Sequence, residues 1–366
     1  MSTDDEVAQP PAKVLAPWLQ AQLECLLTQR GHAWLLQGPS GLGQFDLALA
    51  YARALLCEQA NGQGACGHCG SCHAVDVHTH PDLFMLLPEV LALELGWPLD
   101  QKTQEDLDAK KRKPSKEIKV DAAREMVSFT QFTRSRGTTK VVVVFPAERM
   151  NHITANALLK TLEEPPGEVK FILATEAAHQ LLPTIRSRCI AHTLVWPAFD
   201  PALAWLTQNA SLPNDGPAQK GAKPVSGADL QTLLVAAGGR PADALLWIQA
   251  AAPAESAQFW EALPAAMRRG DAAALAGSAP ADAISILQKL CHDTLASRLG
   301  SDPRFFSKKA IGFQHDALAQ GSGSLKALAA WSKELVQSAR TAEHPYNAGL
   351  MIEHLVSRAC VALNTK

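Results

Sequence analysis

The chain has 366 residues, 47% of them hydrophobic, and a formal net charge of −2 at pH 7. Its length predicts two or three domains, and its hydrophobic content is typical of a globular protein, which excludes wholesale disorder. The near balance of charges excludes DNA binding through bulk positive charge, because phosphate affinity needs a basic surface. No apolar run reaches the ~20 residues of a bilayer-spanning helix, and residues 1–11 do not resemble a signal peptide. We therefore expect a cytoplasmic protein that does not enter a membrane.

Short apolar runs alternate with helix-period stretches from His32 to about Trp196. The predicted strands are 33–37, 83–87, 141–145, 169–174 and 190–195, and the predicted helices are 45–57, 120–132 and 154–163. Each strand is short and mainly apolar, which is typical of strands buried on both faces. The alternation predicts a parallel sheet covered by helices, and therefore an α/β domain.

The character of the sequence changes after Trp196. Segment 199–251 has helical patterns interrupted by a Pro-, Gly-, Lys- and Asn-rich loop at 211–227, and Ala252-Pro253-Ala254 is typical of a joint. Segment 255–366 is rich in Ala and Leu without strand signals, which predicts a helical bundle. We therefore predict three domains, at 1–198, 199–251 and 255–366.

A glycine-rich loop, Gly38-Pro39-Ser40-Gly41-Leu42-Gly43-Gln44-Phe45, joins the first strand to a helix. This context is that of a phosphate-binding loop, in which backbone N–H groups and the helix N-terminus hold phosphate. ATP hydrolysis also needs a lysine for the β- and γ-phosphates and a Ser or Thr hydroxyl for magnesium, and Gln44 and Phe45 hold these two positions. The carboxylate pair expected directly after the valine run 141–144 is replaced by Phe145-Pro146. These coordinated replacements predict a site without ATP hydrolysis; the alternative is that the loop is only a tight turn.

Four cysteines, Cys57, Cys66, Cys69 and Cys72, fall within sixteen residues between that helix and the second strand. Clustered cysteines in a cytosolic protein are more often metal ligands than disulfides. Four thiolates suit a closed, tetrahedral, structural Zn²⁺ site, and the glycines at 64, 67 and 70 allow backbone amides to turn toward the sulfurs. An iron–sulfur cluster is the alternative, because Cys-x-x-Cys-x-x-Cys also opens ferredoxin-type runs.

Three segments carry a resemblance to a known family: Asn-Ala-Leu-Leu-Lys-Thr-Leu-Glu-Glu-Pro-Pro at 156–166, Val-Lys-Phe-Ile-Leu-Ala-Thr at 169–175, and Pro-Thr-Ile-Arg-Ser-Arg-Cys at 183–189. In this order and spacing they resemble the bacterial clamp-loader family of AAA+ proteins, most densely from Gly31 to Cys189. The resemblance implies an α/β RecA-like AAA+ domain with a zinc module at 57–72, an all-α lid, and an all-α C-terminal collar domain that serves oligomerisation. The family shares the cysteine arrangement.

The same resemblance implies a subunit without ATPase activity of its own, so we expect no ATP or Mg²⁺ in this chain. In the family, the arginine of Ser187-Arg188-Cys189 reaches the ATP of a neighbouring subunit, and Arg188 takes that role here as an arginine finger. The family's sensor arginine in the lid falls on Ala242. The implied partners are the gamma or tau ATPase subunits and the delta subunit of the DNA polymerase III clamp loader, and, through the complex, the sliding clamp and primer-template DNA.

Other readings of the same residues remain open. The chain could be an active gamma/tau-like clamp-loader ATPase with unusual ligands, or a zinc-dependent DNA-binding adaptor unrelated to clamp loading. Arg188 could form a surface ion pair, and Arg186 is a neighbouring candidate for the finger. The basic run Lys110–Lys116, in an irregular surface insertion that starts at Leu87, is either a solvated loop or a contact to DNA.

Overall fold

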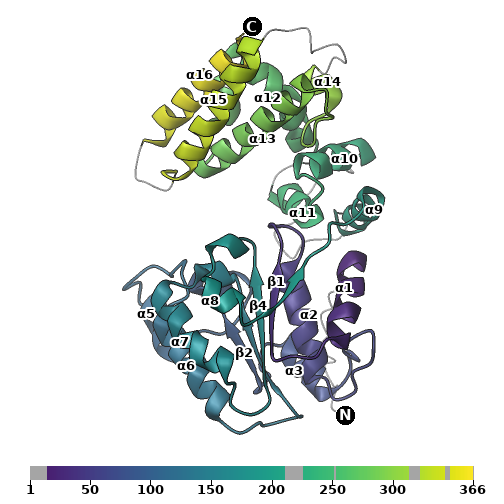
Figure 1. Cartoon of the computed structure of the whole chain (residues 1–366), viewed down its shortest axis with the longest axis vertical. Helices are drawn as coiled ribbons and strands as arrows, with labels where there is room; N and C mark the ends of the chain where they lie inside the picture. Colours follow the sequence, from purple (N-terminus) through teal and green to yellow (C-terminus); the bar gives the residue numbers. More distant parts are fainter. Residues whose placement is uncertain (1–14, 211–225, 251–252, 313–321, 343–346, 366) are drawn as a thin grey trace, which may run out of the picture. The chain divides into compact units, whose positions relative to one another are not determined.

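The computed structural model of the chain describes residues 15–210, 226–250, 253–312, 322–342 and 347–365 (Figure 1). The chain divides into two compact units, 1–196 and 197–366. Most of the predicted loop 211–227 and part of the joint at 252–254 lie outside the described residues. The three-domain division with borders at 198, 251 and 255 stays a prediction. None of the described helices combines the length and apolar character that crossing a bilayer requires.

The first unit contains a five-stranded sheet in the order β2-β3-β4-β1-β5. Its strands are β1 (Ala33–Gln37), β2 (Leu83–Leu86), β3 (Lys140–Val144), β4 (Val169–Thr175) and β5 (Ile190–Thr193). All four strand pairs are parallel. The predicted α/β architecture and the five predicted strands are confirmed, with strand ends displaced by no more than two residues.

Helices cover both faces of this sheet. On one face α2 (Gln44–Leu56) packs against β3 and β4, and Tyr51 of α2 contacts Trp34 of β1 edge to face with ring centroids 5.2 Å apart. On the other face α6 (Val120–Gln131) and α7 (His152–Glu163) enclose the core around Phe171. The expectation of burial on both faces is confirmed for β1, β3 and β4. It is wrong for the edge strands β2 and β5, which have a neighbour on one side only and are partly or largely exposed.

The remaining elements of the first unit are short or peripheral. They are α1 (Pro17–Thr28), α3 (Gly70–Asp76), α4 (Glu89–Glu94), α5 (Gln101–Asp108), α8 (Pro183–Arg186), and 3-10 turns at Ala147–Arg149 and Ala178–Gln180. The insertion after Leu87 is not irregular throughout, because it contains α4 and α5. The side chain of Asp100 caps α5 by accepting from the N–H of Thr103 at 2.9 Å.

The basic run Lys110–Lys116 lies at the surface, but two of its charges are paired within the insertion. Lys111 contacts Asp106 at 2.9 Å, and Arg112 forms an ion pair with Glu89. Lys119 also reaches Glu89, at 2.8 Å. The run is therefore not a continuous patch of free positive charge.

The second unit is helical throughout its described residues. Its helices are α9 (Phe199–Ala210), α10 (Gly227–Ala236), α11 (Pro241–Ala250), α12 (Pro253–Arg269), α13 (Pro280–Arg298), α14 (Lys308–Ile311), α15 (Ser322–Ala339) and α16 (Ala348–Asn364), with a 3-10 turn at Ala272–Leu275. A small core joins α9, α10 and α11 around Leu206 and Leu234. A larger core gathers α10 and the helices from α12 to α16 around Leu263, Leu287 and Leu355. The predicted helical character of this part is confirmed.

Candidate functional site

The glycine-rich loop retains the backbone shape of a phosphate-binding loop. It runs from the end of β1 to the start of α2, and Gly43 begins the helix with a φ of 95°. A Cβ atom at Gly43 would lie 2.6 Å from the Cδ1 atom of Leu19 in α1, so only glycine fits. The helix N-terminus and the strand end are thus placed as a phosphate site requires.

The side chain of Gln44 closes this loop from within. It is 2% exposed, and its Nε2 donates to the carbonyl oxygens of Gly38 at 2.7 Å and Pro39 at 2.6 Å. A working loop has a lysine ammonium at this position, free to reach phosphate. Here a neutral amide is buried and fully engaged by the loop's own backbone, so the position offers no positive charge to a nucleotide.

The expected magnesium side of the site is apolar. The rings of Phe45, at the start of α2, and Phe145, after β3, contact each other with centroids 5.3 Å apart. The carboxylate of nearby Glu148 is held elsewhere: it accepts from the Thr175 hydroxyl at 2.7 Å and from the N–H of Glu176 at 3.1 Å. Magnesium prefers several oxygen ligands, and these two rings supply none.

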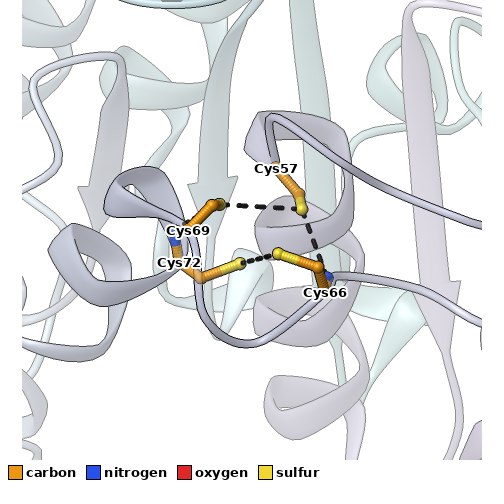
Figure 2. A group of neighbouring side chains, drawn as sticks. All are labelled: Cys57, Cys66, Cys69 and Cys72. Carbon is orange, nitrogen blue, oxygen red and sulfur yellow. Dashed lines mark hydrogen bonds between the residues drawn. The ribbon is translucent and has the colours of Figure 1, made fainter.

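The four clustered cysteines converge on one point, as Figure 2 shows, with all four sulfur atoms within 4.8 Å of one another. Cys57 comes from the end of α2, Cys66 and Cys69 from the following turn, and Cys72 from α3. The Sγ atoms of Cys57 and Cys69 are 3.8 Å apart, and those of Cys66 and Cys72 are 3.9 Å apart. A tetrahedral ion with bonds of about 2.3 Å to sulfur needs sulfur atoms about 3.8 Å apart. The four side chains can therefore hold one metal ion.

Backbone amides around the cluster favour the thiolate form that a metal needs. The N–H groups of Cys66 and Gln59 point at the sulfur of Cys57, at 3.2 and 3.4 Å. Burial raises the pKa of the Cys57 and Cys72 thiols. Burial also opposes ionisation of Cys69, but the N–H of Cys72, 3.4 Å from its sulfur, contributes to a pKa of about 6 there. Of the three glycines expected to shape the turn, those at 64 and 67 have positive φ and the one at 70 does not.

Contacts outside the cluster fix the module to the rest of the domain. The carboxylate of Glu58, directly after Cys57, accepts from the N–H and the hydroxyl of Ser71 at 3.2 and 3.0 Å. Arg53 of α2 binds Asp76 of α3 at 2.6 Å. These pairs hold α3 against α2 and so keep the ligands from the two helices in reach of one ion. Glu58 and Arg53 were not predicted as site residues, because their partners become neighbours only in the folded module.

Arg188 lies at the surface beyond α8, and its guanidinium is already engaged within the chain. Its Nη2 forms an ion pair with Glu163 at the end of α7, and its Nη1 donates to the carbonyl oxygen of Thr184 at 2.7 Å. Its Nε is buried and has no hydrogen-bond partner among the described residues. The predicted alternative, a surface ion pair, is thus present in the isolated chain.

The neighbours of Arg188 have simpler surroundings. The hydroxyl of Ser187 donates to the carbonyl oxygen of Thr184 at 3.1 Å, and Arg186 is exposed. Cys189 packs against the sheet core, and burial raises its pKa to about 12, so it is a structural thiol. In the second unit, Ala242 stands at the position of the family's sensor arginine and carries no charge. The nearby Arg240 forms an ion pair with Asp243 at 3.0 Å.

The parallel sheet with helices on both faces defines an α/β domain, in which a glycine-rich loop between β1 and α2 has Gln44 and Phe45 at its end. Residues 19–196 match the protein family described as DNA polymerase III, delta subunit. DNA polymerase III subunit delta' of Escherichia coli is 34% identical over 289 residues, which cover 77% of this chain and 72% of that protein. The chain belongs to the family of DNA polymerase III delta' subunits.

Two further relatives extend this comparison. The delta' subunit of Pseudomonas aeruginosa is 38% identical over 227 residues, and the match spans 62% of this chain but only 58% of that relative's length. The DNA polymerase III subunit tau of Escherichia coli is 32% identical over 159 residues, covering 43% of this chain and 21% of tau. The similarity to tau is therefore confined to a smaller part of both chains.

Proposed function

We propose that this chain is a clamp-loader subunit that neither binds nor hydrolyses ATP and that acts on the ATP site of a neighbouring subunit. The observation that carries the first half is the position of Gln44, whose amide is buried and bonded to two carbonyl groups of the loop. A phosphate in this loop would therefore gain no cation from this position. The contact between Phe45 and Phe145 adds an apolar wall where magnesium would need oxygen ligands.

Equilibrium binding of labelled ATP with Mg²⁺ to the purified chain tests this half of the proposal. We expect no saturable binding up to millimolar nucleotide and no turnover. The competing hypothesis of an active ATPase with unusual ligands requires the opposite result, with binding abolished when Gln44 is replaced.

The second half of the proposal assigns Arg188 as the arginine finger. Guanidinium is always charged and binds phosphate oxygens through two parallel hydrogen bonds, and its place on the surface makes it available to another chain. A phosphate group of a neighbour would replace Glu163 as the anion that Arg188 contacts. The exchange of one exposed anion for another costs little, because surface ion pairs contribute only about 0–1 kcal/mol.

The cysteine cluster is proposed to hold one structural Zn²⁺. Its support is the set of four sulfurs within 4.8 Å of one another, two pairs of which lie at the 3.8–3.9 Å that a tetrahedral ion requires, since four protein ligands complete a structural site. Metal analysis of the purified chain should give one zinc per chain. Visible absorption would identify the iron–sulfur alternative, because only iron clusters are coloured.

The proposed partners are the gamma or tau ATPase and the delta subunit, and, through the assembled loader in the cytoplasm, the sliding clamp and primer-template DNA. Co-purification with these subunits, followed by ATPase assays with and without this chain, tests the assignment. The rival role of a DNA-binding adaptor requires tight, steeply salt-dependent binding of DNA by the chain alone. The pairing of Lys111 and Arg112 with acidic residues of the same insertion argues against that role.

A further inference from the structure

The outer edge of β2 presents backbone groups that no other strand uses. β2 is the terminal strand of the sheet and pairs only with β3. The carbonyl oxygens of Asp82 and Leu86 accept from N–H groups at the flanks of β3, at 2.9 and 3.1 Å. Because backbone groups alternate in direction along a parallel strand, Met85 turns its N–H and C=O away from β3. Among the described residues, none outside the sheet bonds to them.

A cavity of about 660 Å³ lies along this edge. Its inner wall includes Leu83, Phe84 and Met85 of β2, and its outer wall is formed by the insertion between Trp97 and Arg112. A segment that only shielded an edge strand would pack directly against it. The insertion instead leaves a space of the size that proteins use for ligands.

The cavity wall carries an excess of negative charge. Its carboxylates are Glu89, Asp100, Asp106, Glu117, Asp121 and Glu125, and its cations are Lys102, Arg112 and Lys119. Arg112 and Lys119 are both bound by Glu89, together with the N–H of Ser115 at 2.8 Å. Although burial acts in the opposite direction, these contacts lower the pKa of Glu89 to about 2. Asp106 pairs with Lys111 at 2.9 Å and Asp121 with Arg124 at 3.0 Å, whereas the acidic groups at 100, 117 and 125 face the cavity without an ion pair among the described residues.

Glu125 of α6 is the clearest of these groups. Its carboxylate has no hydrogen-bond or ion-pair partner among the described residues, and the neighbouring Arg124 pairs with Asp121 instead, at 3.0 Å. Burial raises its pKa, and the charges of Asp100 and Asp121 raise it further. A carboxylate whose acidic neighbours disfavour its charge is stabilised by an incoming cation.

We propose that this cavity binds an extended, lysine- or arginine-bearing segment of a partner protein, which adds a strand to the free edge of β2. Main-chain hydrogen bonds to Met85 supply the pairing, as in other complexes formed by strand addition. The basic side chains meet the carboxylates of Glu125 and Asp100, and alternate apolar side chains meet Leu83. A small cation alone would satisfy the carboxylates but not the strand edge. The proposal does not depend on the ATP site or on Arg188, so either can fail without the other.

Two capped pentapeptides, Val-Lys-Val-Lys-Val and Val-Glu-Val-Glu-Val, provide the probes, with calorimetry on the full chain as the measurement. We expect binding of the lysine peptide, weakened by salt, and no measurable binding of the glutamate peptide. Hydrogen exchange should show the amide of Met85 protected only when the lysine peptide is present. Equal binding of both peptides, binding of neither at millimolar concentration, or binding without protection at Met85 overturns the proposal.

Variants distinguish binding in this cavity from a general effect of the protein's charge on peptide binding. Glu125→Lys should weaken the lysine peptide at least tenfold, whereas Glu94→Lys, at an exposed position outside the cavity wall, should leave its affinity unchanged. Met85→Pro removes the outward N–H, a change that edge strands tolerate, and should abolish binding. If Glu125→Lys, an exposed change that leaves the fold intact by circular dichroism, binds as well as the unaltered chain, the cavity is not the site.

Discussion

Two carbonyl groups of the glycine-rich loop depend on the amide of Gln44. Gln44→Ala leaves these acceptors without their donor in a buried place, so we expect the free energy of unfolding to fall by about 1–3 kcal/mol. Urea unfolding measures the loss. The matched control is Gln131→Ala, at an exposed position near the end of α6, which should change stability by less than about 0.5 kcal/mol.

The same residue provides a second comparison. Gln44→Lys restores the charge of a working loop, but Phe45 and Phe145 still provide no magnesium ligand. We therefore expect no ATP turnover from this variant either. ATP turnover by Gln44→Lys would show that Gln44 alone, and not the combination with Phe45 and Phe145, prevents ATP hydrolysis at this site.

Arg188→Ala removes the proposed finger without removing core packing, because the side chain lies at the surface. In a reconstituted loader, ATP turnover at the adjoining site should fall by about 10³-fold or more, and assembly measured by gel filtration should be unaffected. Arg186→Ala is the matched control and should retain turnover. Glu163→Gln, which removes only the intramolecular partner of Arg188, should also retain it. Unchanged turnover in Arg188→Ala would refute the assignment.

At the scale of elements, the cysteine module is a small unit fixed to the end of α2. Removing its ion with a chelator should loosen residues 57–76, because the four metal–sulfur bonds that hold this segment together are lost. The sheet should be unaffected, because it has its own core. Hydrogen exchange should show faster exchange in α3 and unchanged protection in β3 and β4. Cys72→Ser should reproduce the effect, and Cys25→Ser, at an exposed position outside the cluster, should not. Loss of protection across the sheet would contradict a local role.

The strands were predictable because each is a short, mainly apolar run, and three of them are buried on both faces. Helix α1 was not predicted, although Leu19, Leu23 and Leu26 repeat at helical spacing and are buried. Helices α4 and α5 have six and eight residues, too few for a periodic pattern to stand out from the charges around them.

The chemistry of the sites was predictable to a different extent. The metal ligands and the uncharged loop follow from residue types at fixed short spacing. The contacts of Arg188 with Glu163 and of Glu89 with Arg112 join residues more than twenty positions apart, so only the folded chain brings them together. The position of β2 at the edge of the sheet was likewise not predictable, because the alternation of strands and helices in the sequence does not determine the order of strands in the sheet.

At the scale of the whole molecule, the two units have different proposed roles. The loop at 38–45, the cysteines at 57–72 and Arg188 all belong to the first unit. The second unit contributes helices and two apolar cores, and its proposed task, assembly with other subunits, rests on its position in the chain and its helical pattern. It also buries one cation, Lys289 of α13, which is 9% exposed.

Lys289 makes the stability of the second unit depend on pH. Its ammonium donates to the carbonyl oxygen of Ala236 at 2.9 Å and lies 4.8 and 5.0 Å from the ring centroids of Trp247 and Trp260. Burial, with a smaller contribution from Arg240, lowers its pKa from 10.5 to about 8. Between these two values the unfolded chain binds a proton that the folded chain does not, so the free energy of unfolding rises with pH through this range.

Comparison with Lys289→Met isolates this effect, since thiols that titrate in the same range are present in both proteins. The difference in unfolding free energy, wild type minus variant, should increase by about 2 kcal/mol between pH 7.5 and 9.5. Urea unfolding at the two pH values, followed by the fluorescence of the tryptophans around Lys289, gives this difference. A constant difference would mean that Lys289 keeps the pKa of an exposed lysine, and that the aromatic rings and the carbonyl of Ala236 compensate fully for its burial.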